Sequence, residues 1–250
     1  MVLQRIANVG EPRFSLIRDF VRGLMRFCAN KIAHTTSSLK EKRKQTSAPF
    51  GVRRFDSCRG RFYKMSEIYE PEEDSYLMSE AIKAEIPKLL KKNLELKFLE
   101  VGCGSGINLL SVKKIGVKVE NILGSDINPE AVKHCKKLGF RVINSNLFNN
   151  IKGKFDIIVF NPPYLPLDKR EPKSSRRETT GGKKGNEIII KFLKQAKKHL
   201  AEGGRIFIIT SSLSENINFR PLGYRAKEIS NKKLFFEKIF VWELNFKRDI

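Results

Sequence analysis

The chain has 250 residues and a formal net charge of +22, from 49 Lys and Arg against 27 Asp and Glu. This length gives room for one large domain, or for one domain with an extension. No apolar run approaches the length needed to span a bilayer, and the four cysteines have neither disulfide nor metal spacing. We therefore expect a soluble, cytoplasmic protein with no metal site and no membrane contact.

Residues 1–64 differ in composition from the rest, because they hold fifteen Lys and Arg but four Asp and Glu. The stretch from Thr35 to Lys64 has too few aliphatic residues to bury a core, whereas an apolar stripe from Phe14 to Cys28 fits a basic amphipathic helix. Three interpretations stay open: a disordered tail that contacts RNA or ribosomes by charge, an organelle-targeting peptide, or a start assigned too early, with Met65 as the true start. We predict a basic extension over 1–64 and a folded domain over 65–250.

Helical and strand-like patterns alternate along this domain, as a doubly wound sheet requires. Helices are predicted over 75–90, 106–114, 129–138 and 187–200. Strands are predicted over 98–101, 121–125, 141–144, 155–160 and 205–210, with a final antiparallel hairpin over 224–229 and 235–244. The polar segment 165–184 is predicted to be a long functional loop. Its basic side chains form either a solvated face or a contact with an anionic partner: Lys169, Arg170, Lys173, Arg176 and Arg177.

The first predicted strand leads into a glycine-rich turn, Glu100-Val101-Gly102-Cys103-Gly104-Ser105-Gly106. Glycine permits positive φ and a close approach of the backbone to a ligand. A dinucleotide-binding loop has a similar pattern, but Glu100 suits a cationic ligand better than a pyrophosphate. Asp126 ends the second strand, where a carboxylate can accept hydrogen bonds from both hydroxyls of a ribose. Enzymes that use NAD share this acid, so Asp126 alone does not discriminate.

The fourth predicted strand ends in Asn161-Pro162-Pro163-Tyr164, a motif typical of enzymes that methylate a planar, weakly nucleophilic nitrogen. The side-chain carbonyl of Asn161 and the next backbone carbonyl can accept the two N–H hydrogens, so that the lone pair faces the methyl donor. The two prolines stiffen the loop, and Tyr164 offers a flat face to the planar group. No general base is required, because orientation and proximity supply most of the help. Together with the glycine turn and Asp126, the motif indicates S-adenosylmethionine as the donor.

Over about residues 66–245, the chain resembles the HemK/PrmC-like glutamine methyltransferases, in particular their archaeal and eukaryotic branch. The run Tyr69-Glu70-Pro71-Glu72-Glu73-Asp74-Ser75-Tyr76 is similar to the opening signature of that branch. Gly181-Gly182 with Gly185 resembles the family's substrate-side loop, and Lys233-Leu234-Phe235-Phe236-Glu237 its closing hairpin. Asn146-Leu147 departs from the usual Asp-Leu, so the expected bond to the adenine amino group would lack a charge.

The resemblance implies an α/β, Rossmann-like class I methyltransferase fold: a mostly parallel seven-stranded sheet with helices on both faces and an antiparallel C-terminal hairpin. The catalytic residues are expected to be Asn161, Pro162, Pro163 and Tyr164. The cofactor-binding residues are expected to be Ser75, Glu100, Gly102, Gly104, Gly106, Asp126, Ile127, Asn146, Leu147 and Asn161. The substrate is expected to meet Asn161, Tyr164, Gly181 and Gly182. Because the carboxyl ends of parallel strands share one edge, Glu100, Asp126, Asn146 and Asn161 should lie on one rim.

The resemblance further implies that the acceptor is the glutamine side chain of the Gly-Gly-Gln motif in a peptide chain release factor, which acts in translation termination. Two alternatives stay open. The high positive charge favours a nucleic-acid amino methyltransferase that acts on adenine N6 or guanine N2 of RNA or DNA. The third interpretation is an inactive RNA-binding module of the same fold.

A small zinc-binding activator protein that pairs with a sheet edge is also implied by the resemblance. One physical hint agrees, because the apolar residues around the second and third strands exceed what one edge needs to pack inward. These residues are Ile115, Val117, Val119, Ile122, Leu123, Phe140, Val142 and Ile143.

Overall fold

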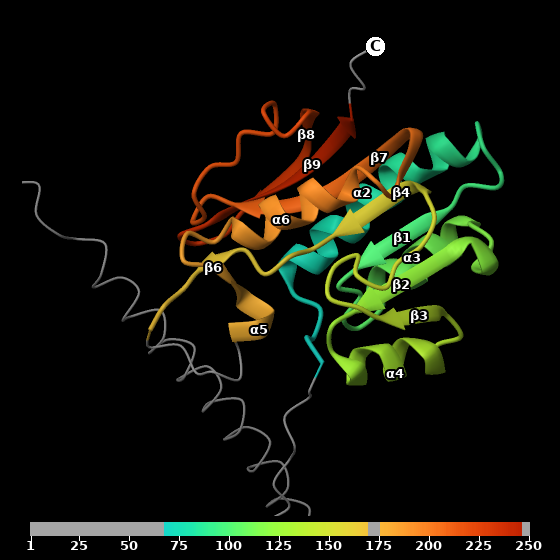
Figure 1. Cartoon of the computed structure of the whole chain (residues 1–250), viewed down its shortest axis with the longest axis horizontal. Coiled ribbons are helices and arrows are strands. Elements are labelled where there is room, and N and C mark those ends of the chain that lie inside the picture. Colours follow the sequence, from blue (N-terminus) through green and yellow to red (C-terminus); the bar gives the residue numbers. More distant parts are fainter. Residues whose placement is uncertain (1–67, 170–175, 247–250) are drawn as a thin grey trace, which may run out of the picture. The chain divides into compact units, whose positions relative to one another are not determined.

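Seven strands form one sheet in the order β3-β2-β1-β4-β7-β9-β8 (Figure 1). The computed structural model describes residues 68–169 and 176–246; the N-terminal extension, Met65, Arg170 and Lys173 lie outside the described residues. The strands are β1 (Phe98–Val101), β2 (Ile122–Asp126), β3 (Arg141–Asn144), β4 (Phe155–Phe160), β7 (Leu200–Ser211), β8 (Tyr224–Lys233) and β9 (Lys238–Phe246). The run from β3 to β7 is parallel, and β9 pairs antiparallel with both β7 and β8. This is the predicted fold.

Helices cover both faces of the sheet (Figure 1). They are α2 (Glu73–Leu90), α3 (Ile107–Ile115), α4 (Pro129–Lys137), the short α5 (Arg176–Thr179) and α6 (Glu187–Ala196), with a 3-10 turn η1 (Val119–Asn121) before β2. Ile157 and Val159 of β4 pack into a core with α2, α3 and α4, whereas Ile158 and Phe160 pack into a second core with α6. Successive strand residues point to opposite faces, so a continuous apolar run is what a strand covered on both faces needs.

The chain order reverses between β1 and β4. From β1 the chain passes outward to β2 and β3, then returns to place β4 on the other side of β1. The chain therefore leaves the carboxyl ends of the neighbouring strands β1 and β4 in opposite directions. Ligands bind at such a point in open α/β sheets. Gly102 follows β1 and Asn161 follows β4, and the pairing of Val101 with Phe160 brings the two loops side by side.

Predicted and observed bounds agree within two residues for α2, α3, α4 and β1 to β4. The helix predicted over 187–200 was too long, because α6 ends at Ala196 and Leu200 begins β7 opposite Phe155. A register shift follows before Arg205 pairs with Ile157. Leu200 continues the apolar pattern of the helix, so its long-range pairing with β4 overrides the local pattern.

The segment 165–184 is not a loop throughout. Its described part contains β5 (Leu165–Pro166), α5 and β6 (Thr180–Gly182), and β5 pairs with β6 in a separate two-stranded sheet. This pairing supplies hydrogen-bond partners to backbone groups that the domain would otherwise leave unsatisfied.

The physical hint for an exposed apolar edge is wrong. Of the eight residues on which it rests, Val117, Ile122, Leu123, Phe140 and Val142 are buried, and the other three are half-buried. The hint failed because α3 and α4 pack onto this side of the sheet and cover more apolar surface than a single edge strand would.

None of the described helices has the length and apolar character to cross a membrane.

Candidate active site

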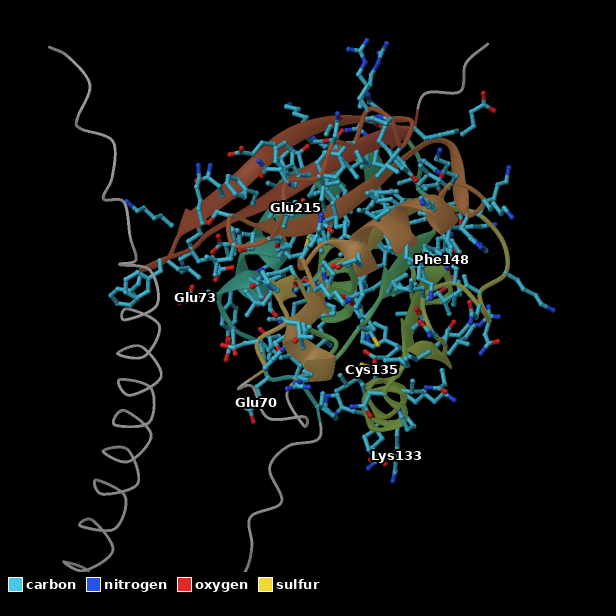
Figure 2. All side chains as sticks on the ribbon, turned by 60° about the vertical axis from the view of Figure 1, so that its left-hand side comes forward. Glu70, Glu73, Lys133, Cys135, Phe148 and Glu215 are labelled. Carbon is cyan, nitrogen blue, oxygen red and sulfur yellow. The ribbon has the colours of Figure 1, made fainter. Side chains whose placement is uncertain are left out.

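Three glycines with positive φ form the turn after β1. Gly102, Gly104 and Gly106 have φ of 69°, 46° and 78°, values that favour glycine. A Cβ on Gly106 would lie 2.9 Å from the Sγ of Cys135, which points inward from α4 while Lys133 points away (Figure 2). The Cys135 thiol contacts the Gly104 carbonyl at 3.4 Å and hydrogen-bonds to Cys103, so two cysteines far apart in the sequence meet beneath this turn.

Glu100 is a buried acid directly before this turn. Its side chain is 2% exposed, and Oε1 accepts a hydrogen bond from Asn108 Nδ2 of α3 at 2.8 Å. The other oxygen, Oε2, is buried without a hydrogen-bond partner. Burial raises the pKa of Glu100 well above its usual range, although the bond from Asn108 acts in the opposite direction. A buried acceptor of this kind is costly to leave unpaired, so it fits a cationic or N–H donor brought by a ligand.

The carboxylate of Asp126, at the end of β2, accepts hydrogen bonds from the backbone of two turns. Its Oδ2 accepts from Gly104 N and its Oδ1 from Asn128 N, both at 2.8 Å. Asn144 donates to the carbonyls of Asp126 and Ile127, at 3.0 and 3.1 Å, and so fixes the backbone beyond the strand. Ile127 is 48% exposed. A ribose contact at Asp126 would add to these bonds, since each carboxylate oxygen has two lone pairs.

The pair Asn146-Leu147 follows β3. Leu147 has φ of 50°, which is rare for a side chain of this size, and its side chain is packed in the core next to α6. Ser145 holds the turn, because its hydroxyl donates to the Leu147 carbonyl at 2.9 Å and accepts from Asn150 N at 3.1 Å. Asn146 is exposed. The backbone of this turn is thus fixed, while the Asn146 side chain stays accessible to a ligand.

Asn161 begins the loop after β4. Its side-chain oxygen Oδ1 is buried and has no hydrogen-bond partner. Pro162 is buried and Pro163 half-buried, and neither has an N–H that could satisfy that oxygen. An orphaned amide oxygen at the reversal point of the sheet is what recognition of an N–H donor requires.

Tyr164 closes this loop, and its hydroxyl reaches the start of α2. It donates to Asp74 Oδ2 at 3.3 Å, and the Tyr69 hydroxyl lies 3.1 Å from Asp74 Oδ1. Burial, then the nearby charges of Asp74 and Glu237, raise the pKa of Tyr164 far above its usual range. Ser75 turns toward the same acid, with its N and Oγ at 2.6 and 3.2 Å from Asp74 Oδ1. The backbone N–H and the hydroxyl of Ser75 thus contact the Asp74 carboxylate.

The glycines of the 181–185 segment pack against the backbone of the Asn-Pro-Pro-Tyr loop. A Cβ on Gly181 would lie 2.6 Å from the Pro163 carbonyl oxygen, and one on Gly185 would lie 2.5 Å from that of Tyr164. The Ser214 hydroxyl donates to the same Tyr164 carbonyl at 2.6 Å. Gly182 pairs with Pro166 through the β5–β6 ladder. The predicted substrate-side glycines therefore also support the catalytic loop.

Sequence reasoning missed several polar residues that hold the site. Asp74, Asn108, Asn144 and Ser214 each bond to a predicted site residue or its backbone. Asp74 lies inside the opening signature, which was a usable signal. The other three gave none, because their partners lie in other segments of the chain.

The residues on this rim suit S-adenosylmethionine. The unpartnered Glu100 oxygen suits a ligand's ammonium group, the Asp126 carboxylate is a suitable acceptor for ribose hydroxyls, and exposed Ile127 offers an apolar surface to an adenine. Within the described residues, no group of three or more His, Cys, Asp or Glu side chains is placed to hold a metal ion.

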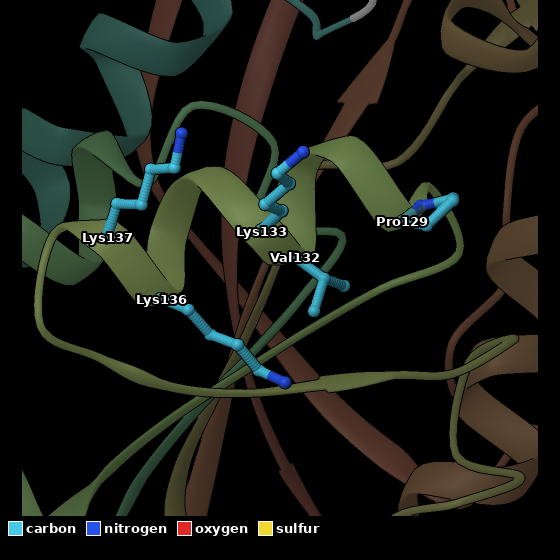
Figure 3. Close-up of a pocket in the computed structure, with 5 residues that line it drawn as sticks. All are labelled: Pro129, Val132, Lys133, Lys136 and Lys137. Carbon is cyan, nitrogen blue, oxygen red and sulfur yellow. The ribbon is translucent and has the colours of Figure 1, made fainter.

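A hollow of about 500 Å³ lies elsewhere, along α4 (Figure 3). Its lining consists of Pro129, Val132, Lys133, Lys136 and Lys137. None of these residues belongs to the rim formed by the strand ends, and none of their side chains carries an acceptor for the ammonium group of a methyl donor. We therefore place the active site at the rim and not in this hollow.

Comparisons with known proteins identify the family to which the chain belongs. The profile of the family described as "Methyltransferase small domain" matches residues 85–218. A Methanocaldococcus jannaschii protein named for an expected protein N5-glutamine methyltransferase activity is 38% identical over 196 residues, which cover 71% of this chain and 93% of that protein. The release factor glutamine methyltransferase of Aquifex aeolicus is 30% identical over 81% of this chain and 73% of its own length.

Among solved structures, the Mtq2–Trm112 complex of E. cuniculi has a chain that matches with a TM-score of 0.52 and 23% identity. The match covers 72% of this chain and 99% of that one, and it shows the fold. Fold and site together define a class I methyltransferase that uses S-adenosylmethionine. The chain belongs to the methyltransferase small domain family, and within it to the HemK-like glutamine methyltransferases that its motifs resemble.

Proposed function

We propose that this enzyme methylates the side-chain amide nitrogen of the glutamine in the Gly-Gly-Gln motif of a peptide chain release factor. The observation that carries the proposal is the buried, unpartnered Oδ1 of Asn161, one strand away from the glycine turn. A primary amide has two N–H hydrogens and a delocalised lone pair, so it needs two acceptors that turn that lone pair toward the donor.

In the proposed reaction, Asn161 Oδ1 and the backbone carbonyl of Pro162 accept the two amide hydrogens, and the Tyr164 ring lies against the amide plane. S-Adenosylmethionine supplies an electrophilic methyl group on a sulfonium. The amide nitrogen forms a bond to that carbon as the carbon–sulfur bond breaks, and one amide proton is then released to solvent. Asn161 and Tyr164 orient the acceptor, and this proximity effect supplies most of the rate enhancement.

The remaining predicted residues are assigned to the donor and the substrate. Glu100 accepts from the donor's ammonium group, Asp126 from its ribose, and the turn at Asn146 and Leu147 meets the adenine beside Ile127. Gly102, Gly104 and Gly106 let the backbone approach the donor, and Ser75 contributes through the start of α2. Gly181 and Gly182 face the substrate side. The support for the roles of Glu100, the glycine turn, Asp126 and the Asn146 turn is their common rim at the strand ends.

The acceptor is supported by the names of the relatives. One is named for N5-glutamine methylation, another for release factor glutamine methylation, and the E. cuniculi complex is described as responsible for methylation of the translation termination factor eRF1. A planar exocyclic amino group of adenine or guanine could use the same two acceptors. Nucleic acid therefore remains the alternative acceptor.

The test is methyl transfer from labelled S-adenosylmethionine to three acceptors in parallel: purified release factor, total RNA and duplex DNA. We expect label on the release factor, and none on a release factor whose Gly-Gly-Gln glutamine is replaced by alanine. That replacement is the matched control, because it removes one side chain and keeps the rest of the acceptor. Label in RNA or DNA with none on the release factor would contradict the proposed acceptor.

We also propose a small zinc-binding activator subunit as a partner. Its support is the solved complex of the related Mtq2 chain with Trm112, together with the outer edge of β3, which pairs with no other strand among the described residues. We expect co-expression with the activator to raise yield and activity. A monodisperse, fully active enzyme made alone would contradict an obligate partner. Contact of the basic extension with RNA and a cytoplasmic location stay predictions.

A further inference from the structure

We infer that Asp74 is a positioning residue for the reaction and acts by holding the hydroxyl of Tyr164. The inference rests on the proposed function, since it assumes that the Tyr164 ring lies against the acceptor. Asp74 lies in the first turn of α2, ninety residues before Tyr164 in the sequence. The residue is 6% exposed, so it is nearly removed from water.

The Asp74 carboxylate is shared by three parts of the chain. Oδ1 accepts from Ser75 N at 2.6 Å and lies 3.2 Å from Ser75 Oγ, which fixes it within α2. The Tyr69 hydroxyl, from the segment before α2, lies 3.1 and 3.2 Å from the two carboxylate oxygens. The Tyr164 hydroxyl, from the catalytic loop, donates to Oδ2 at 3.3 Å. Asp74 thus ties the opening signature to the catalytic loop.

The two ends of Tyr164 are held by different residues. Its backbone carbonyl accepts from Ser214 Oγ at 2.6 Å and is packed by Gly185. Its ring tip reaches Asp74. The terminal torsion of a tyrosine ring is broad, so fixing the backbone does not by itself fix the ring plane. A hydrogen bond to Asp74 fixes the position of the hydroxyl at the ring tip. Because the phenolic O–H prefers to lie in the ring plane, the direction of this bond also favours one ring plane, which is what a planar acceptor must match.

A second acid, Glu237, makes the burial of the Asp74 charge energetically unfavourable. Glu237 lies near Asp74, its Oε1 is buried without a partner, and burial followed by the Asp74 charge raises its pKa despite a bond from Ser211. A simple role for Asp74 as a favourable charge at the start of a helix would not need burial beside Glu237. Glu73, the preceding residue, supplies such a charge from the surface, where it pairs with Lys232.

Turnover of four variants tests the inference: Asp74→Asn, Tyr164→Phe, the double variant, and Glu73→Gln as the control. Asp74→Asn keeps the size of the side chain but replaces one carboxylate oxygen by NH2. Because Ser75 N and Oγ hold Oδ1, the NH2 takes the place of Oδ2, which accepts from the Tyr164 hydroxyl. We expect each single variant at 74 or 164 to lower kcat by about 10- to 100-fold, because a misplacement of about 1 Å at a reacting group can cost about 100-fold. The double variant should be no slower than the slower single one, because both remove the same hydrogen bond. Glu73→Gln should keep wild-type kcat, and donor Kd should stay unchanged in Tyr164→Phe and Glu73→Gln.

Independent effects, in which the two fold-losses multiply, would overturn the inference, and so would a wild-type kcat for Asp74→Asn. The assay uses whichever of the three acceptors the wild-type enzyme labels. A failure of the proposed function would therefore appear as a different acceptor, whereas a failure of the inference would appear as multiplying losses.

A second readout needs no acceptor. The chain has five tyrosines, so 13Cζ-labelled tyrosine gives few NMR signals, which single Tyr→Phe substitutions assign. Asp74→Asn should shift the signals of Tyr69 and Tyr164 and leave that of Tyr224, whose hydroxyl bonds to the Leu193 carbonyl, unchanged. A Tyr164 signal that does not move in the folded variant would overturn the inference, whatever the acceptor.

Discussion

Asn161 carries a buried amide oxygen with no partner of its own. We predict that Asn161→Ala abolishes turnover and leaves donor binding largely intact, since the side chain orients the acceptor in the transition state. Loss of one such contact typically costs about 3 kcal/mol or more, which lowers kcat by at least about two orders of magnitude. Single-turnover kinetics and calorimetric titration with donor measure the two quantities. Turnover within a few-fold of wild type would mean that the motif is no more than a turn.

Asp126→Ala is the converse of that experiment. Its carboxylate holds Gly104 N and Asn128 N at 2.8 Å, so its loss loosens the donor-binding turn as well as removing ribose contacts. We expect weaker donor binding, measured as a higher donor Kd, with turnover recovered in part at saturating donor. An unchanged Kd would exclude Asp126 from the donor site.

Glu100 makes stability depend on pH. Burial raises its pKa in the fold above the ordinary 4.5, so between these two values the folded chain holds a proton that the unfolded chain has released. Stability from this group is therefore lost as pH rises through that interval. Glu100→Gln cannot titrate, and we predict that its melting temperature relative to wild type increases as pH rises above about 4.5. Thermal melts across pH measure this difference.

The control for that series is Glu95→Gln. Glu95 is exposed, and its hydrogen bond with Lys118 lowers its pKa. The ionised Glu95 therefore stabilises the fold above its ordinary pKa, and this stabilisation is lost as pH falls. Its substitution should therefore give a small change of the opposite sign. A difference between Glu100→Gln and wild type that is constant from acidic to neutral pH would contradict the assignment of Glu100 as a buried acid.

At the scale of the element, the β5–β6 sheet supports the catalytic loop through close backbone contacts. We predict that Gly185→Ala lowers kcat strongly, because its Cβ would lie 2.5 Å from Tyr164 O and 3.0 Å from Pro166 N. Backbone atoms cannot move aside as the end of a flexible side chain can. Turnover and melting temperature are measured together for this variant and its control.

Gly139→Ala is the matched control. Gly139 has φ of 88° against 84° for Gly185, but a Cβ added at Gly139 would meet no atom within 4 Å beyond its chain neighbours. Both substitutions therefore incur a similar backbone strain of about 1–2 kcal/mol, and Gly185→Ala alone adds the steric conflict. Equal losses of turnover in the two variants would show that strain, and not displacement of the loop, is responsible.

At the scale of the whole molecule, the predicted boundary at residue 65 concerns how much of the chain the enzyme needs. We predict that a chain shortened to begin at Met65 folds, binds donor and methylates its acceptor as well as the full chain, because residues 73–246 supply the seven strands of the sheet, the helices that cover it and the site residues. Melting temperature, donor Kd and kcat are compared with those of the full chain. A collapse of the melting temperature would assign residues 1–64 to the domain.

The sequence predicted β1, β3 and β4 to the residue, and the order along the chain of the seven sheet strands and of α2, α3, α4 and α6, but it missed β5, α5 and β6. Strands buried on both faces read as short apolar runs bounded by turns, and this signal is local. It failed at Leu200, where an apolar residue at a helical spacing pairs instead with β4. It failed again at the β2–β3 edge, where helix packing covers the apolar residues.

The sequence by itself determined the residue types and their places along the chain: the glycine turn with Glu100, the acid after β2 and the Asn-Pro-Pro-Tyr loop. These follow from local backbone geometry and from the chemistry of each side chain. The tertiary structure decided which residues meet, such as Asp74 with Tyr164, Cys103 with Cys135, and Gly185 with the catalytic loop. Such contacts join segments up to ninety residues apart, and the packing of the whole domain sets them, so no local pattern could reveal them.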